Sequence, residues 1–205
     1  MNIVIGGAIE TRKCAEYEKR NFIPRSSSVA IAIGMAVVVL IVGIILVRAA
    51  FSPNAFRVER SITIKAPPER IFHLIDDFHN FGAWSPWEHL DPAMQRSITG
   101  TPSGKGAVYE WSGNAKAGAG RMEILESTPS SRVKMQLDFL KPFKNRNTAE
   151  YTLTPQGDAT RVTWAMYGPS PFISKIMQVF VTMDKMIGGD FEKGLAAMKS
   201  ATEHS

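Results

Sequence analysis

The stretch V-E-R-S-I-T-I-K-A-P-P-E-R-I-F, residues 58–72, contains the transition from strand to helix that organises the fold. Val58, Ile62 and Ile64 alternate along its first half, which is typical of a strand with one buried face. The proline pair that follows opens a helix, because proline is tolerated in the first turn of a helix. We therefore expect the soluble part of the chain to begin with a strand near Phe56 and to continue into an amphipathic helix.

A corner with two tryptophans, F-G-A-W-S-P-W-E at residues 81–88, follows this helix. After the corner, six runs of alternating apolar residues separated by turn residues predict an antiparallel sheet. From residue 172 to residue 201, apolar residues recur at helical spacing and predict one long amphipathic helix, with a bend near Gly188 and Gly189. This order of elements makes the fold class α+β. The six runs are Met94–Thr99, Ala107–Ser112, Gly120–Ser127, Arg132–Leu140, Thr148–Thr154 and Thr160–Tyr167.

The charge of the chain argues against a nucleic-acid partner. The formal net charge is +5 over 205 residues, but residues 51–205 hold eighteen Lys and Arg against sixteen Asp and Glu. A protein that follows phosphates concentrates its basic residues on one face, whereas here they alternate with acidic ones. Cys14 is the single cysteine, so no internal disulfide forms and an unpaired thiol is expected.

Residues 29–47 form an uncharged run of nineteen residues, which is long enough to cross a bilayer as a helix. The sequence therefore predicts a polar segment at 1–28, a transmembrane helix at 29–50, a linker at 51–55 and a folded domain at 56–203. A buried core helix and a cleaved signal peptide are the alternatives. The apolar run is longer than the core of a typical signal peptide and begins late, although Arg48-Ala-Ala leaves processing open.

Five Lys and Arg precede this helix and four follow it within reach, at positions 48, 57, 60 and 65. The positive-inside rule then favours a cytoplasmic N-terminus with the folded domain on the other side, by a margin of one charge.

Six short sequence motifs occur along the chain in an order that resembles the SRPBCC superfamily, whose fold is the START or helix-grip fold. More narrowly, they resemble its bacterial polyketide cyclase/dehydrase-like branch. Together these motifs span residues 56–203. The resemblance implies a curved antiparallel sheet of about seven strands around a long C-terminal helix, with an apolar cavity between them. It also implies a hydrophobic ligand, such as a lipid, a sterol or a polyketide, and a single-pass protein of the bacterial inner membrane. The six motifs are residues 58–72, 81–88, 109–114 (Y-E-W-S-G-N), 120–124 (G-R-M-E-I), 162–166 (V-T-W-A-M) and 183–195 (M-D-K-M-I-G-G-D-F-E-K-G-L).

Catalytic groups are not evident in the sequence. His89 with Glu88 or Asp91 is the most plausible acid–base set, but surface polar residues in a loop explain these side chains better. Residues 100–106 are glycine-rich, yet Gly106 stands where a phosphate loop needs Ser or Thr. We therefore assign no catalytic residue, no metal ligand and no cofactor.

The candidate functional residues are those expected to line a cavity, since apolar pockets with few polar groups are the usual small-molecule sites. A closed core is the alternative for the same side chains. Glu110, Arg121, Asp138 and Tyr167 are candidates for polar groups inside. At the corner, we expect Trp84 to pack beneath the helix and Trp87 to lie at the cavity rim. The predicted lining residues are Tyr109, Trp111, Met135, Leu137, Phe139, Tyr151, Trp164, Met166, Met177, Phe180, Met183 and Ile187.

The sequence thus predicts a membrane-anchored protein that binds a hydrophobic small molecule or lipid. Its expected partners are that ligand and the membrane, with no nucleic acid. Two alternatives stay open: an enzyme similar to a polyketide cyclase or dehydratase, and a membrane-localised module for protein interaction or stress response.

Overall fold

The computed structural model describes residues 25–203 of the chain, which divides after Arg48 into two units. The first contains most of helix α2, Arg25–Ala50. In the described range this is the one helix that is long and apolar enough to cross a membrane, with a mean hydropathy of 3.2 over its most apolar part. The polar segment expected at 1–28 lies almost wholly outside the described residues, as does Cys14. The second unit contains the folded domain.

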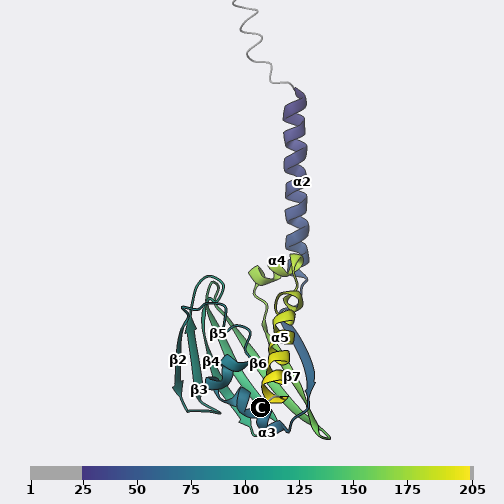
Figure 1. The fold of residues 1–205 in the computed structure, drawn as a ribbon. Coiled ribbons are helices and arrows are strands. Elements are labelled where there is room, and N and C mark those ends of the chain that lie inside the picture. The colour runs from purple at the N-terminus through teal and green to yellow at the C-terminus, as the bar shows by residue number, and fades with distance from the viewer. Residues whose placement is uncertain (1–24, 204–205) are drawn as a thin grey trace, which may run out of the picture. The chain divides into compact units, whose positions relative to one another are not determined.

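The folded domain is built on an antiparallel sheet of seven strands among the described residues, in the order β1-β7-β6-β5-β4-β3-β2. Figure 1 shows the sheet curving from β2 to β7, which confirms the predicted α+β helix-grip fold. The first strand, β1, pairs antiparallel with the last strand, β7, so that Ala55 lies opposite Pro169 and Ile64 opposite Thr160. The strands are β1 (Ala55–Ile64), β2 (Gln95–Gly100), β3 (Ala107–Ser112), β4 (Ala119–Thr128), β5 (Arg132–Lys141), β6 (Asn145–Gln156) and β7 (Ala159–Pro169).

Helices cover one face of this sheet. Helix α3, Pro68–Asp76, begins at the predicted proline pair and buries Ile71, Phe72 and Ile75. A short 3-10 helix, η1 (Phe78–Ala83), leads into the tryptophan corner. The C-terminal helix α5, Met183–Glu203, lies along the sheet and buries its apolar face there. The core therefore forms between α3, α5 and the inner face of the sheet.

The C-terminal helix differs from the prediction, because the structure divides it into α4, Phe172–Phe180, and α5. The break lies at Val181, whose backbone is extended. Thr182 then begins the next helix, since its Oγ1 accepts a hydrogen bond from the backbone N–H of Lys185 at 3.3 Å. A side-chain oxygen at this position satisfies a backbone donor that has no partner within the helix.

The interruption of the C-terminal helix lies earlier than the bend predicted at Gly188, because α5 continues through this glycine. The glycine instead lets α5 approach β1. A Cβ on Gly188 would lie 2.3 Å from Nη2 of Arg60. The Arg60 guanidinium donates to Asp184 Oδ1 and to Glu192 Oε1, each at 2.7 Å, and so bridges two turns of α5. The glycine is therefore a packing residue between helix and strand.

Candidate functional site

A cavity of about 240 Å³ lies between the inner face of the sheet, the beginning of α5 and the tryptophan corner. Of its 21 lining residues, residues 81–94 contribute seven, the sheet with the loop at 113–118 contributes twelve and α5 contributes two. Most of them are aromatic or aliphatic. The volume lies just below the range of about 300–1,000 Å³ that is usual for small-molecule sites. The cavity is thus suited to a compact apolar molecule.

Trp164 is the centre of the aromatic wall. Its ring stacks on Phe191 of α5 with centroids 4.1 Å apart and planes 2° apart, and on Tyr151 of β6 with centroids 5.1 Å apart. Trp84 and Trp87 meet it edge to face. Trp164 Nε1 has no accessible surface and no hydrogen-bond acceptor, and it is the one side-chain polar atom of residues 25–203 for which both hold.

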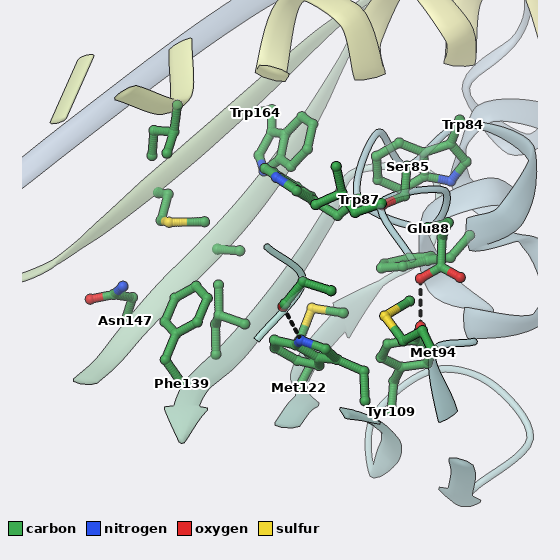
Figure 2. A pocket seen from close by; sticks show the side chains of 18 of the residues that line it. Trp84, Ser85, Trp87, Glu88, Met94, Tyr109, Met122, Phe139, Asn147 and Trp164 are labelled. Carbon is green, nitrogen blue, oxygen red and sulfur yellow. Dashed lines mark hydrogen bonds between the residues drawn. The ribbon is translucent and has the colours of Figure 1, made fainter. Parts of the chain in front are cut away.

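The two tryptophans of the corner have different surroundings. Trp84 is 3% exposed and donates Nε1–H to the carbonyl oxygen of Leu74 at the end of α3, at 2.7 Å. Trp87 is half-buried and packs against Trp164 and Phe191, with centroids 5.4 Å and 6.1 Å away. Both line the cavity, and Figure 2 shows Trp87 beside Trp164 with Trp84 beyond it.

A polar network of the buried Glu88 and Tyr109 with the more exposed Arg96 lies at one end of the cavity. Glu88 Oε1 accepts a hydrogen bond from the Tyr109 hydroxyl at 2.5 Å (Figure 2). Glu88 Oε2 accepts one from Arg96 Nε at 2.8 Å. Arg96 also donates to the backbone oxygens of Glu88 and Met94. Burial and the hydrogen bond to Glu88 raise the pKa of Tyr109, so this phenol stays protonated at neutral pH. The carboxylate is therefore paired, and its two oxygens are both engaged.

Other polar groups reach the cavity at separate points. Asn147 is 4% exposed and lies beside Phe139, away from Glu88 in Figure 2. The hydroxyl of Tyr151 has no hydrogen-bond partner among the described residues, and burial alone raises its pKa well above the ordinary value. Tyr151 lies directly opposite Trp164 in the pairing of β6 with β7. The wall thus carries two adjacent donors, a phenol and an indole N–H, that no acceptor in the described part of the chain satisfies.

Nine of the twelve residues predicted to line a cavity do surround this one, while Met135, Met177 and Phe180 do not. Met135 is fully buried in the core. Met177 and Phe180 belong to α4 rather than to the cavity-lining helix, and their side chains are 46% and 69% exposed. The early break at Val181 explains this difference, because it turns α4 away from the path of α5.

The side chains expected to be polar groups inside have other partners. Asp138, Arg121 and Tyr167 do not line the cavity, and they bond to Arg146, Glu123 and Glu150. Glu110 is exposed and 3.9 Å from Arg121.

His89 is also exposed, so it forms no acid–base set with the buried Glu88. Asp91 instead accepts the backbone N–H of Asn114 at 2.7 Å.

Sequence reasoning missed lining residues that a stricter use of alternation would have found. Asn147 has the same parity as Ala149 and Tyr151, but the strand was expected to begin only at Thr148. Met122 shares the parity of Ile124 on β4. The segment after the corner, which adds Leu90 and Met94, has no periodicity from which its position could be predicted.

Residues 55–203 match the protein family described as polyketide cyclase/dehydrase and lipid transport. A search of curated protein sequences found no match.

Solved structures show the same fold at low identity. Protein CV1439 from Chromobacterium violaceum is 16% identical with a TM-score of 0.50, and the match covers 74% of this chain and 99% of that one. Protein MLL2253 from Mesorhizobium loti is 18% identical (TM-score 0.52; 72% and 99% covered). The Aha1 dimer from Colwellia psychrerythraea is 18% identical (TM-score 0.51; 72% and 96% covered). Because the family match extends over most of the chain, the protein belongs to the polyketide cyclase/dehydrase and lipid-transport family.

Proposed function

We propose that this protein is a membrane-anchored binding protein for a compact, largely apolar molecule with a neutral hydrogen-bond acceptor. The observation that carries the proposal is the cavity of about 240 Å³ with its aromatic walls, formed between sheet and α5. A filled core would leave no such space, because protein interiors pack about as densely as organic crystals. Ligands of polyketide or lipid character fit both the family and the walls.

The polar groups in the wall indicate what the ligand carries. Tyr151 and Trp164 offer neighbouring donors, and an unsatisfied buried donor costs about 1–3 kcal/mol. A carbonyl or hydroxyl oxygen would satisfy either of them. Glu88 is already paired with Arg96, and Lys116, the basic residue of the lining, is exposed to solvent. A neutral acceptor on an apolar body is therefore the class of ligand that the wall favours.

Helix α2 supports the anchoring part of the proposal. Its most apolar section, Ser28–Ala50, is 23 residues long, and about 20 apolar residues as a helix cross the hydrocarbon core. Apolar ligands concentrate in the bilayer, so an anchored cavity would sample them at a high local concentration. A tether to the membrane thus serves a binding function directly.

An enzymatic function similar to that of a cyclase or dehydratase is the second candidate. Glu88 and Tyr109 favour it, because a carboxylate and a phenol 2.5 Å apart both line the cavity. Catalysis would require Glu88 to exchange a proton with the ligand. Conversion of a bound polyketide-like compound that is lost in Glu88→Gln, while binding is kept, would establish this candidate in place of simple binding.

The binding proposal is tested with the full chain purified in detergent. Native mass spectrometry followed by solvent extraction should reveal a co-purified apolar compound, and lipids or polycyclic ketones should raise the melting temperature. Finding neither a bound compound nor a thermal shift would contradict the proposal.

Two matched variants locate the site. Ala149 lines the cavity, whereas Ala107 is fully buried and does not line it. Ala149→Leu should fill the space and abolish ligand retention at little cost in stability. Ala107→Leu should overpack the core, at about 1–3 kcal/mol, and leave retention intact in the folded fraction. Equal retention in both variants would show that the ligand binds elsewhere.

A further inference from the structure

Helix α4 has the reverse of the usual distribution of polar and apolar residues. Within α4, whose nine residues are all described, Lys175 is the only buried one, and its Nζ donates to Asn54 Oδ1 at 2.6 Å. Most of its large apolar side chains are exposed to solvent instead. A helix on a water-facing surface normally buries its apolar side, so these side chains indicate a partner that is itself apolar. We call the exposed residues the apolar patch: Phe172 (51% exposed), Ile173 (55%), Met177 (46%), Phe180 (69%) and Val181 (45%).

A second group of exposed apolar residues lies at the same end of the domain. Leu140 near the end of β5 is 51% exposed, and Phe143 in the turn between β5 and β6 is 64% exposed, next to the exposed Lys144. The register places this turn with the patch, since Thr148 pairs with Tyr167 near the end of β7, just before α4. Figure 1 shows the β5–β6 turn and α4 at the same end of the sheet. Aromatic and aliphatic side chains beside a lysine are typical of segments that lie in a membrane interface.

The covalent chain brings this end close to any membrane that α2 spans. Helix α2 ends at Ala50, and residue Asn54, only four positions later, is bonded to the region of α4. Its backbone oxygen accepts the N–H of Ser170 at 2.8 Å, and its side chain accepts Lys175 Nζ. Four extended residues reach at most about 14 Å. Asn54, whose partner Ser170 lies two residues before α4, is therefore held within about 14 Å of the end of α2 by the covalent chain.

This end of the domain is also one end of the cavity. Phe139 of β5, Asn147 of β6 and Met166 of β7 line it near the ends of their strands. Met183, the first residue of α5, lines it only two positions after Val181 of the patch. If the apolar patch contacts lipid, the Met183 end of the cavity therefore lies next to the bilayer.

We infer that the apolar patch and the β5–β6 turn form a second membrane contact, which lies in the interface of the bilayer that α2 spans. The contact fixes the orientation of the domain and directs the Met183 end of the cavity towards lipid. The inference rests on the proposed anchoring by α2. A bilayer is the occupant that the short tether favours over a soluble protein or a second copy of the chain.

The test uses the full chain with Cys14→Ser, reconstituted in vesicles of phosphatidylcholine and phosphatidylglycerol. A polarity-sensitive fluorophore is attached to single cysteines introduced by Phe180→Cys, by Phe143→Cys, by Asp158→Cys in the β6–β7 turn and by Ile41→Cys within α2. Lipids spin-labelled on their acyl chains should quench the probes at positions 180, 143 and 41 and leave the probe at 158 unquenched. Asp158 is the matched control because it is exposed and lies at the opposite end of β7.

The pattern of quenching separates the two proposals. Quenching at 41 with none at 180 or 143 would overturn the second contact and leave the anchor intact. No quenching at 41 would overturn both. A probe at 180 that is shielded without quenching, together with a disulfide between two unlabelled Phe180→Cys chains, would show that a second copy covers the patch. Ile173→Asp with Met177→Asp changes exposed positions only, and it should abolish quenching at 143 while quenching at 41 persists.

Discussion

The indole of Trp84 donates its Nε1–H to the carbonyl oxygen of Leu74, 2.7 Å away, and thereby joins the tryptophan corner to the end of α3. Leu74 lies in the last turn of that helix, where carbonyl groups have no partner within the helix. The ring also meets Trp164 and Tyr151 edge to face, with centroids 5.5 Å and 5.8 Å away. One side chain thus satisfies a helix end and fills the space between that helix and the sheet.

Trp84→Ala should therefore lower the free energy of unfolding by about 3–5 kcal/mol, the usual cost of removing a large buried aromatic side chain. Trp84→Phe keeps most of the packing and loses the hydrogen bond, so its cost should be about 1–3 kcal/mol. Urea unfolding of the full chain in detergent, followed by circular dichroism, measures both. A loss below about 1 kcal/mol for the alanine variant would show that the corner is not a structural element.

Two glycines of α5 provide a matched pair for the packing between helix and sheet. A Cβ on Gly194 would lie 2.8 Å from the Trp164 ring and 3.1 Å from Pro86, whereas nothing lies within 4 Å of one on Gly189. Gly194→Ala should cost about 1–3 kcal/mol, because neither a stacked ring nor a proline yields easily. Gly189→Ala should stabilise by up to about 1 kcal/mol through helix propensity. Thermal melts of the two variants should shift in opposite directions, and a shared direction would contradict this account of α5.

The fold could be predicted from the sequence because its signals are local and repeated. Alternation placed each strand within a few residues, as for Arg132–Leu140 against the observed Arg132–Lys141 of β5. The break after α4 could not be predicted, because Val181 and Thr182 carry no strong helix-stopping signal and the apolar spacing continues across them. Alternation also indicated most of the cavity wall. Side chains alternate between the two faces of a strand, so one residue known to point inward identifies the other inward residues of that strand.

Polar chemistry in the cavity was less predictable than its walls. Whether Glu88 points inward depends on Arg96 and Tyr109, which come from two different strands and approach only in the folded sheet. Likewise, only the pairing of β6 with β7 reveals that Tyr151 and Trp164 are neighbouring donors. Such groups are defined by tertiary contacts, and a single sequence carries no spacing rule for them.

Two tyrosines of the cavity should respond differently to loss of the hydroxyl. Tyr109→Phe leaves Glu88 Oε1 without its donor in a buried network, so the expected cost is about 1.5–3 kcal/mol, as for hydrogen bonds to charged groups. Tyr151→Phe removes a hydroxyl with no partner among the described residues, and the stability should stay within about 0.5 kcal/mol or rise.

Urea unfolding of ligand-free protein compares these two variants, and retention of the co-purified compound provides the second measurement. Tyr151→Phe should weaken retention of a compound with a carbonyl or hydroxyl group, because it removes a donor from the wall. If Tyr151→Phe is as destabilising as Tyr109→Phe, the hydroxyl has a structural partner and the assignment of a free donor is wrong.

Alkaline pH should destabilise the fold through three phenols that are buried or half-buried in it. Burial and the hydrogen bond to Glu88 raise the pKa of Tyr109, burial raises that of Tyr151, and burial with the hydrogen bond to Glu150 raises that of Tyr167. The unfolded chain releases these protons near pH ~10, whereas the folded chain retains them. The stabilisation is therefore complete below about pH 10 and falls as the pH rises beyond it. Urea midpoints that decline from about pH 10 upwards, with phenolate absorbance that appears only on unfolding, would agree with this linkage. Tyr109→Phe should flatten the decline, and phenolate formation in the folded protein near pH ~10 would contradict the burial of these hydroxyls.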